Sequence, residues 1–181
     1  MPRLMRERAD LIPELAEIFR EYGFEGASLA FITERTGLGK GSLYNFFPGG
    51  KAEMAGAVLE HISRWFEEDI FVPLEQGGSL SEMLSHVKTY FAGGGRVCLV
   101  GMFALTETRD QFAVQIAAYF ERWEVALVAY LVRQGKHPAE AQAGALDILV
   151  TIQGGLTLSR ARNSPQYFLQ GLKRLRQDYQ G

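Results

Sequence analysis

A short polar segment carries the side chains of this sequence best suited to binding a partner outside the chain. The residues from Gly39 to Phe47 form a helix that is too short and too polar to serve only as core. Its polar members supply a cation, two hydroxyl groups and an amide: Lys40, Ser42, Tyr44 and Asn45. Such groups hydrogen-bond to the phosphate oxygens and base edges of a double helix. We therefore expect this helix to bind DNA.

A second short helix is expected just before it. Ser28 can cap a helix that runs to about Arg35, because its side-chain oxygen can accept a hydrogen bond from the first turn. Gly37 follows, at a point where a chain leaving a helix often needs a positive φ. Two short helices joined by a glycine-containing turn have the size of a helix-turn-helix, whose second helix enters the major groove.

The segment from Ser28 to Phe47, followed by Lys51, resembles the DNA-binding signature of the TetR/AcrR transcriptional regulators. The match covers about residues 5 to 55, and its most characteristic parts are Gly37, the run Gly41-Ser42-Leu43-Tyr44, Phe47 and Lys51. The resemblance implies an all-α protein: an amino-terminal three-helix bundle with a helix-turn-helix, and a larger helical domain for ligand binding and dimerisation. We place the DNA-binding domain at residues 1–50 and the second domain at residues 51–181.

The resemblance also implies roles for single residues. Lys40, Ser42 and Asn45 would approach base edges or nearby phosphates, and Ser28 belongs to the same DNA-binding set. Tyr44 and Lys51 would contact the phosphates of the DNA backbone, with Lys51 assisted by the N-terminus of its helix. The apolar residues between them would pack inside: Ile32, Leu38, Leu43 and Phe47.

Several positions depart from the family pattern. Ala30 and Phe31 stand where relatives usually carry polar residues, and Gly39 replaces a common capping hydroxyl. The turn of residues 48–50 could also shift the reach of Lys51. Together with the acidic charge balance, these departures leave one alternative open: a helical protein-interaction module that keeps the helix-turn-helix without reading DNA.

Composition restricts the remaining function classes. The 181 residues carry a formal net charge of −2, so any attraction to phosphates must come from a local patch. No apolar run approaches the roughly 18 residues of a membrane span, and the basic start of the chain lacks the apolar core of a secretory signal. The lone cysteine, Cys98, lies in an apolar run and excludes an intramolecular disulfide. We expect a cytoplasmic protein with no membrane partner and an inert buried thiol.

Catalytic and metal-binding patterns are absent from the sequence. It has no Ser-His-Asp order, no glycine loop after a strand, and only three histidines, at positions 61, 86 and 137. We expect neither an enzyme nor a metal site, and no cofactor.

Apolar residues recur at helical spacing through the rest of the chain. Gly23 is expected to end the first helix, and a capping box opens at Ser79. The expected helices span residues 3–22, 51 to about 72, 79–92, 96–108, 110–134, 139–162 and 165–179.

Apolar and aromatic side chains in these helices are candidates for an effector pocket: Ile62, Trp65, Phe66, Met83, Val87, Phe91, Met102, Phe103, Phe112, Ile116, Tyr119 and Trp123. Such a lining suits a small apolar or aromatic effector. The same spacing fits the plain core of a helix bundle, so both interpretations stay open. Polar residues in these helices could orient a ligand or lie on solvated faces: His61, His86, Arg96, Thr106, Glu107 and Gln115.

The last two helices are candidates for the interface of a homodimer. Glycines within a helix often permit close approach of another backbone, and the family typically dimerises through a four-helix interface. The candidate contacts are Gly154, Gly155, Leu158, Phe168, Leu172 and Leu175. Two-fold symmetry would place two reading helices on a palindromic operator. We expect a repressor that a small-molecule effector releases from this operator.

Overall fold

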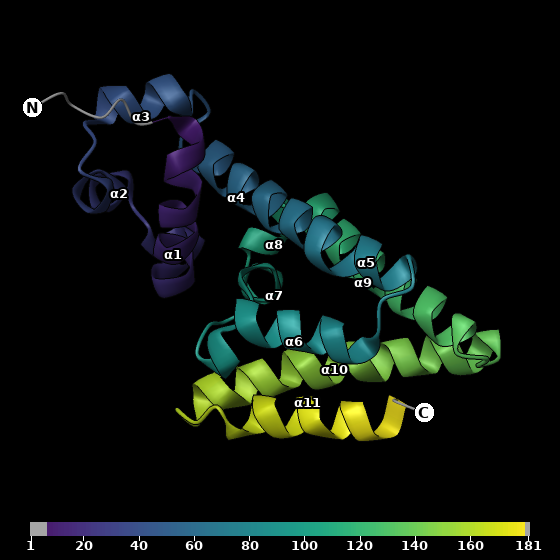
Figure 1. Ribbon diagram of the computed structural model, residues 1–181. Helices are drawn as coiled ribbons and strands as arrows, with labels where there is room; N and C mark the ends of the chain where they lie inside the picture. The colour runs from purple at the N-terminus through teal and green to yellow at the C-terminus, as the bar shows by residue number, and fades with distance from the viewer. Residues whose placement is uncertain (1–6, 180–181) are drawn as a thin grey trace, which may run out of the picture. The chain divides into compact units, whose positions relative to one another are not determined.

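A computed structural model describes residues 7–179 of the chain, and within that range it contains helices and turns but no strand (Figure 1). The expected all-α class is confirmed. The α-helices are α1 (Arg8–Gly26), α2 (Leu29–Thr36), α3 (Lys40–Phe46), α4 (Gly50–Phe66), α5 (Val72–Glu75), α6 (Leu80–Tyr90), α7 (Leu99–Ala104), α8 (Thr108–Gln111), α9 (Ala113–Arg133), α10 (Pro138–Ala161) and α11 (Gln166–Tyr179). The first helix was expected from Arg3; residues 3–6 lie outside the described residues.

One compact unit comprises residues 7–63 and 99–116. Its amino-terminal helices pack around fully buried apolar residues: Leu11, Leu15, Phe19, Ile32, Leu43 and Phe47. Helix α7 joins this unit by packing on α1, where the rings of Phe19 and Phe103 are 6.2 Å apart. Helices α1, α2 and α3 therefore pack on one another, and α1 also packs on α7.

Local sequence explains how the two short helices begin and end. The Ser28 hydroxyl accepts a hydrogen bond from the Phe31 backbone N–H at 3.1 Å, which satisfies one free donor of the first turn of α2. Gly37 ends α2 with φ of +67°, a conformation that favours glycine. At Gly23, with φ of +70°, the regular geometry of α1 is interrupted. The Ser28 cap and the Gly37 end are confirmed, whereas α1 is only interrupted at Gly23 and continues to Gly26 rather than ending there.

A second compact unit comprises residues 64–98 and 117–179. Helices α10 and α11 lie side by side in it (Figure 1), and α6 contacts α11. Close packing depends on Gly155, because a Cβ atom there would lie 3.0 Å from the Cα of Phe168. The capping box of α6 is confirmed: Ser79 Oγ accepts from Glu82 N–H, and the Glu82 carboxylate accepts from Ser79 N–H.

The helix that begins as α4 does not end near residues 71–73 as expected. It continues through a π-helical turn, η1 (Glu67–Phe71), into α5. Pro73 explains the turn: proline has no N–H, and its ring would clash with the carbonyl of Asp69 four residues earlier. The wider turn relieves this clash, and Val72 N–H bonds to the Glu67 carbonyl instead.

Another difference concerns the helix expected over residues 96–108. The Arg96 N–H bonds back to the Phe91 carbonyl at 3.0 Å, as part of the glycine turn that closes α6. The helix can therefore begin only later, and it forms as the short α7 followed by α8, while α9 starts at Ala113 rather than Asp110. The functional boundary expected after residue 50 stays a prediction. Across residues 7–179, no helix combines the length and the apolarity that crossing a bilayer requires.

Candidate nucleic-acid interface

Helix α3 divides cleanly into a buried and an exposed face. Leu43 and the following Phe47 are fully buried, as expected. The polar residues are exposed: Lys40, Ser42, Tyr44 and Asn45. Tyr44 is 39% exposed, so its ring is not a core aromatic. Among the residues that the structure describes, none of these four side chains has a hydrogen-bond or ion-pair partner, which leaves their donors and acceptors available to a ligand.

Bare backbone lies in the middle of this exposed face. Gly41 is exposed, and a Cβ atom added there would meet no other atom within 4 Å. The helix therefore has room for a partner surface to approach its backbone closely.

Ser28 and Lys51 have contacts within the chain. The Ser28 hydroxyl is exposed, and while it accepts from Phe31 N–H, its own hydrogen stays free to be donated. Lys51 is half-buried: its Nζ donates to the Phe24 carbonyl oxygen at 2.8 Å and lies 4.4 Å from the centre of the Phe24 ring. Lys51 therefore has a structural role in the first unit, and its contact with DNA stays a prediction.

A network that the sequence did not indicate holds the turn between α3 and α4. Arg8 Nε donates to the Phe46 carbonyl at 3.2 Å, its Nη2 pairs with Glu53 Oε1 at 3.2 Å, and its guanidinium lies 4.9 Å from the Phe47 ring centre. The other oxygen of Glu53 accepts from Gly49 N–H at 2.7 Å. These contacts fix the end of α3. Arg8 and Glu53 are 45 residues apart, so no periodicity in the sequence could connect them.

The unusual Phe31 has a packing role. Its ring lies 4.4 Å from that of Tyr22 on α1, and the Arg35 guanidinium lies 5.6 Å from its centre. The Tyr22 hydroxyl donates to the Glu21 carboxylate, and this hydrogen bond raises the pKa of Tyr22 above its ordinary value. Phe31 thus anchors α2 on α1 through the contact of its ring with that of Tyr22.

The residues expected to form the effector pocket are divided between the two units. Ile62, Met102, Phe103, Phe112 and Ile116 belong to the first, and Trp65, Phe66, Met83, Val87, Phe91, Tyr119 and Trp123 belong to the second. Nearly all are buried, and they pack ring against ring: the Phe66 centroid lies 5.1 Å from those of Tyr119 and Trp123. They form packed core in this structure, and their role in binding an effector stays a prediction.

The expected interface residues also differ in environment. Gly155, Phe168, Leu172 and Leu175 are buried between α10 and α11 of the same chain, whereas Gly154 and Leu158 are exposed. Val150, an apolar neighbour of the two glycines in the sequence, and Leu146, which the sequence did not single out, continue the exposed row at four-residue spacing and are 60% and 57% exposed. Within residues 7–179 no group of three metal-ligating side chains comes together, and Cys98 is buried.

Comparison with known proteins identifies both parts of the chain. Residues 12–58 match the family described as bacterial regulatory proteins, tetR family, which covers α2 and α3. Residues 79–173, more than half of the chain, match the family described as transcriptional regulator LmrA/YxaF-like, C-terminal domain.

Individual proteins agree with these matches. The chain is 26% identical over 166 residues to the uncharacterized HTH-type transcriptional regulator YxaF of Bacillus subtilis, covering 84% of each chain. It is 28% identical over 123 residues to the HTH-type transcriptional repressor DhaR of a Mycobacterium species, covering 64% of this chain and 61% of that protein. A TetR transcriptional regulator from Legionella pneumophila has the same fold, with a TM-score of 0.84 at 18% identity over 98% of this chain and 100% of that chain. The chain therefore belongs to the TetR family of transcriptional regulators and carries their helix-turn-helix DNA-binding domain.

Proposed function

We propose that the protein is a homodimeric repressor that leaves its operator when a small apolar or aromatic effector binds to the carboxy-terminal region. The observation that carries the DNA-reading part is the exposed face of α3, whose four polar side chains have no partner among the described residues. The stability of the fold does not require a lysine, two hydroxyls and an amide on the exposed face of one short helix, because that helix packs through the buried Leu43. Base edges and phosphates would supply the partners.

Dimerisation is supported by the exposed row on α10. Leu146, Val150 and Leu158 occupy one helix face with Gly154 between them, and half or more of each apolar side chain faces solvent. A second copy of this row would cover it, and the missing side chain at Gly154 would let two helices approach closely. One α3 helix reads few base pairs, so two-fold symmetry would double the contacts on a palindromic operator with half-sites about 34–36 Å apart.

The effector is proposed to enter the aromatic core of the second unit. Trp123 is fully buried, and its indole Nε1 has no hydrogen-bond partner among the described residues. A buried donor without a partner costs about 1–3 kcal/mol, and a ligand oxygen would recover this loss. An aromatic effector with a hydrogen-bond acceptor fits both the rings around Phe66 and this donor.

Coupling to the DNA-binding helices is proposed to use α7 and the residue that ends α8. The rings of Phe103 and Phe112 lie 6.1 and 5.6 Å from that of Phe24, whose carbonyl holds Lys51 at the start of α4. An effector that stabilises a different placement of α7 would therefore disturb the first turn of α4. The relative DhaR carries the name of a repressor, which favours repression over activation. A cytoplasmic location follows from such a role.

Fluorescence anisotropy on DNA from upstream of the protein's own gene, beside a scrambled duplex, tests the proposal. We expect specific affinity to exceed non-specific affinity by at least about 10³, and the Asn45→Ala variant to lose most of this preference. Lys136→Met, an exposed lysine of the second unit, is the matched surface control. Equal weak binding to both duplexes across salt concentrations would favour the interaction-module alternative. If operator affinity stays unchanged when tryptophan fluorescence shows that an aromatic compound has saturated the protein, the release mechanism is wrong.

A further inference from the structure

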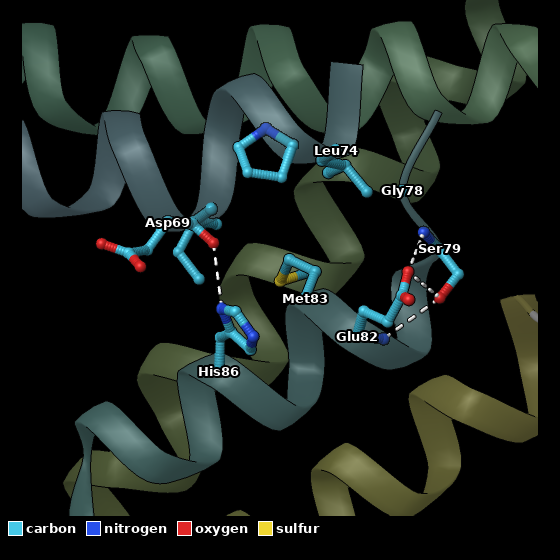
Figure 2. Close-up of a pocket in the computed structure, with 9 residues that line it drawn as sticks. Asp69, Leu74, Gly78, Ser79, Glu82, Met83 and His86 are labelled. Atoms are coloured by element: carbon cyan, nitrogen blue, oxygen red, sulfur yellow. Dashed lines mark hydrogen bonds between the residues drawn. The ribbon is translucent and has the colours of Figure 1, made fainter. Parts of the chain in front are cut away.

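A cavity of about 330 Å³ lies in the second unit beside η1, α5 and the start of α6 (Figure 2). Its size is at the lower end of the range of small-molecule pockets, about 300–1,000 Å³. Its lining includes Ile70, Leu74, Met83, Glu82 and His86. Of the residues considered for effector binding, Met83 and the polar candidate His86 line this cavity, but none of the aromatic residues proposed to hold the effector does, so this is a different site.

The cavity has an apolar floor and acceptor groups at its rim. Ile70, Leu74 and Met83 are almost fully buried and form the floor. Glu82 and His86 lie one helical turn apart on α6, with Met83 beside them (Figure 2). No lysine or arginine is among the described residues that line the cavity.

The hydrogen bonds of the rim decide what it offers a ligand. His86 Nδ1 lies 3.1 Å from the Asp69 backbone carbonyl, which Pro73 cannot bond. A carbonyl can only accept, so Nδ1 carries the hydrogen and Nε2 presents a lone pair when the ring is neutral. Glu82 Oε2 accepts from Ser79 N–H and Oγ–H, which leaves Oε1 available to a ligand. These bonds also lower the pKa of Glu82, which is therefore ionised at neutral pH.

The negative charge of this rim is not neutralised by the chain. Arg122 pairs with two other acidic residues of the same segment, Glu67 at 2.7 Å and Glu75 at 2.8 Å. Neither Glu82 nor Asp69 has an ion-pair partner within residues 7–179. In Figure 2 the Asp69 carboxylate points away from Met83, so its charge acts through space rather than by contact.

We propose that this cavity binds an organic ammonium ion with a short apolar or aromatic body. The ammonium group donates to Glu82 Oε1 and to His86 Nε2, and the body lies on Leu74 and Met83. Glu82 and His86 are exposed at the mouth of the cavity, and a charge-assisted hydrogen bond to this carboxylate gives the cation its advantage over a neutral molecule of the same shape. An anion is repelled by both carboxylates.

Binding is tested with 2-phenylethylammonium and its neutral counterpart 2-phenylethanol, by NMR of the full-length protein labelled at its methionine methyl groups. We expect the amine to shift the Met83 signal, assigned from Met83→Leu, and to leave the signal of Met102 in the first unit unchanged. Glu82→Gln should weaken amine binding about tenfold or more without affecting the alcohol. This variant still folds, because glutamine serves equally in a capping box. Glu68→Gln removes a neighbouring exposed charge that does not line the cavity, and it should bind the amine like the wild type.

Three results would overturn the proposal: equal binding of the amine and the alcohol, equal weakening by Glu68→Gln and Glu82→Gln, or an unmoved Met83 signal at concentrations that shift Met102. The experiment contains no DNA. Its outcome is therefore independent of whether the protein represses transcription or binds an aromatic effector elsewhere.

Discussion

Lys51 Nζ and the carbonyl oxygen of Phe24 are 2.8 Å apart, and this hydrogen bond joins the first turn of α4 to the end of α1. The Phe24 ring packs in turn on Phe103 and Phe112. The lysine that the family signature assigns to the DNA backbone therefore also holds the first unit together. Lys40, by contrast, is exposed and has no partner among the described residues.

The two lysines should respond differently to the same substitution. Lys51→Met leaves the Phe24 carbonyl without this donor, and we expect the free energy of unfolding to fall by about 1–3 kcal/mol. Lys40→Met should leave stability within about 0.5 kcal/mol, weaken operator binding and reduce the salt slope by about one. Urea unfolding and anisotropy at several salt concentrations measure both effects. Equal stability losses in the two variants would contradict the structural role of Lys51.

The parts of the interface that depend on turn chemistry could be predicted from sequence. Ser28 caps α2 and Gly37 ends it with a positive φ, because these residue types are favoured at such positions for local reasons. The contact between Lys51 and Phe24 could not be predicted in this way, because its acceptor is a backbone carbonyl 27 residues away. Every residue has a backbone carbonyl, so the sequence of side-chain types does not indicate which carbonyl Lys51 will bond.

Arg8 and Glu53 should position α3 without contacting a base. Arg8→Gln removes the ion pair, the hydrogen bond to the Phe46 carbonyl and the cation over Phe47, whereas Glu53→Gln removes the ion pair alone. Because both side chains are partly exposed, we expect a coupling energy of only about 0.5 kcal/mol in a double-mutant cycle on stability. Operator affinity should fall in both variants, while the ranking of mutated operator sequences stays the same. A changed ranking would show that Arg8 reads bases directly.

Gly37 and Gly41 offer a matched pair for testing how closely α3 approaches DNA. Gly37→Ala places a side chain at φ of +67° and should cost about 1–2 kcal/mol of stability. Gly41→Ala adds a methyl group in open space within a helix, and should raise stability by about 0.5–1 kcal/mol. If DNA lies against α3, the more stable Gly41→Ala protein should nevertheless bind the operator more weakly. Unchanged operator affinity in this variant would place the DNA elsewhere.

The capping box of α6 should make stability depend on pH. Hydrogen bonds from Ser79 lower the pKa of Glu82 in the folded chain below its value in the unfolded chain. Its contribution is therefore present above the unfolded pKa and is lost as the pH falls through the folded pKa. Between about pH 5 and pH 3, thermal melting followed by circular dichroism should show a steeper loss for the wild type than for Glu82→Gln. Parallel curves would mean that the charge contributes nothing to the cap.

Helix periodicity identified the apolar row of α11 and only part of the exposed row of α10, and it could not say what covers either row. Phe168 and Leu172 follow the same spacing rule as Leu146 and Val150, yet the first two are buried within the chain and the last two are exposed. A row at four-residue spacing indicates only that a helix has an apolar face. Whether another helix of the same chain or a second copy covers that face depends on the packing of the whole unit.

Gly154 and Gly155 on α10 test whether a helix face is covered by the same chain or by a second copy, because one faces solvent and the other faces α11. Gly155→Ala would bring a methyl group to 3.0 Å from the Phe168 Cα, and we expect a loss of about 1–3 kcal/mol because the α10 and α11 backbones must move apart. Gly154→Ala meets no atom of its own chain, so a monomer should gain about 0.5–1 kcal/mol. In a dimer that closes on the exposed row around Val150, the same methyl group would instead lie in the interface. Sedimentation equilibrium should then show weaker dimerisation for Gly154→Ala, and an unchanged dimer constant would exclude this face of α10 as the contact.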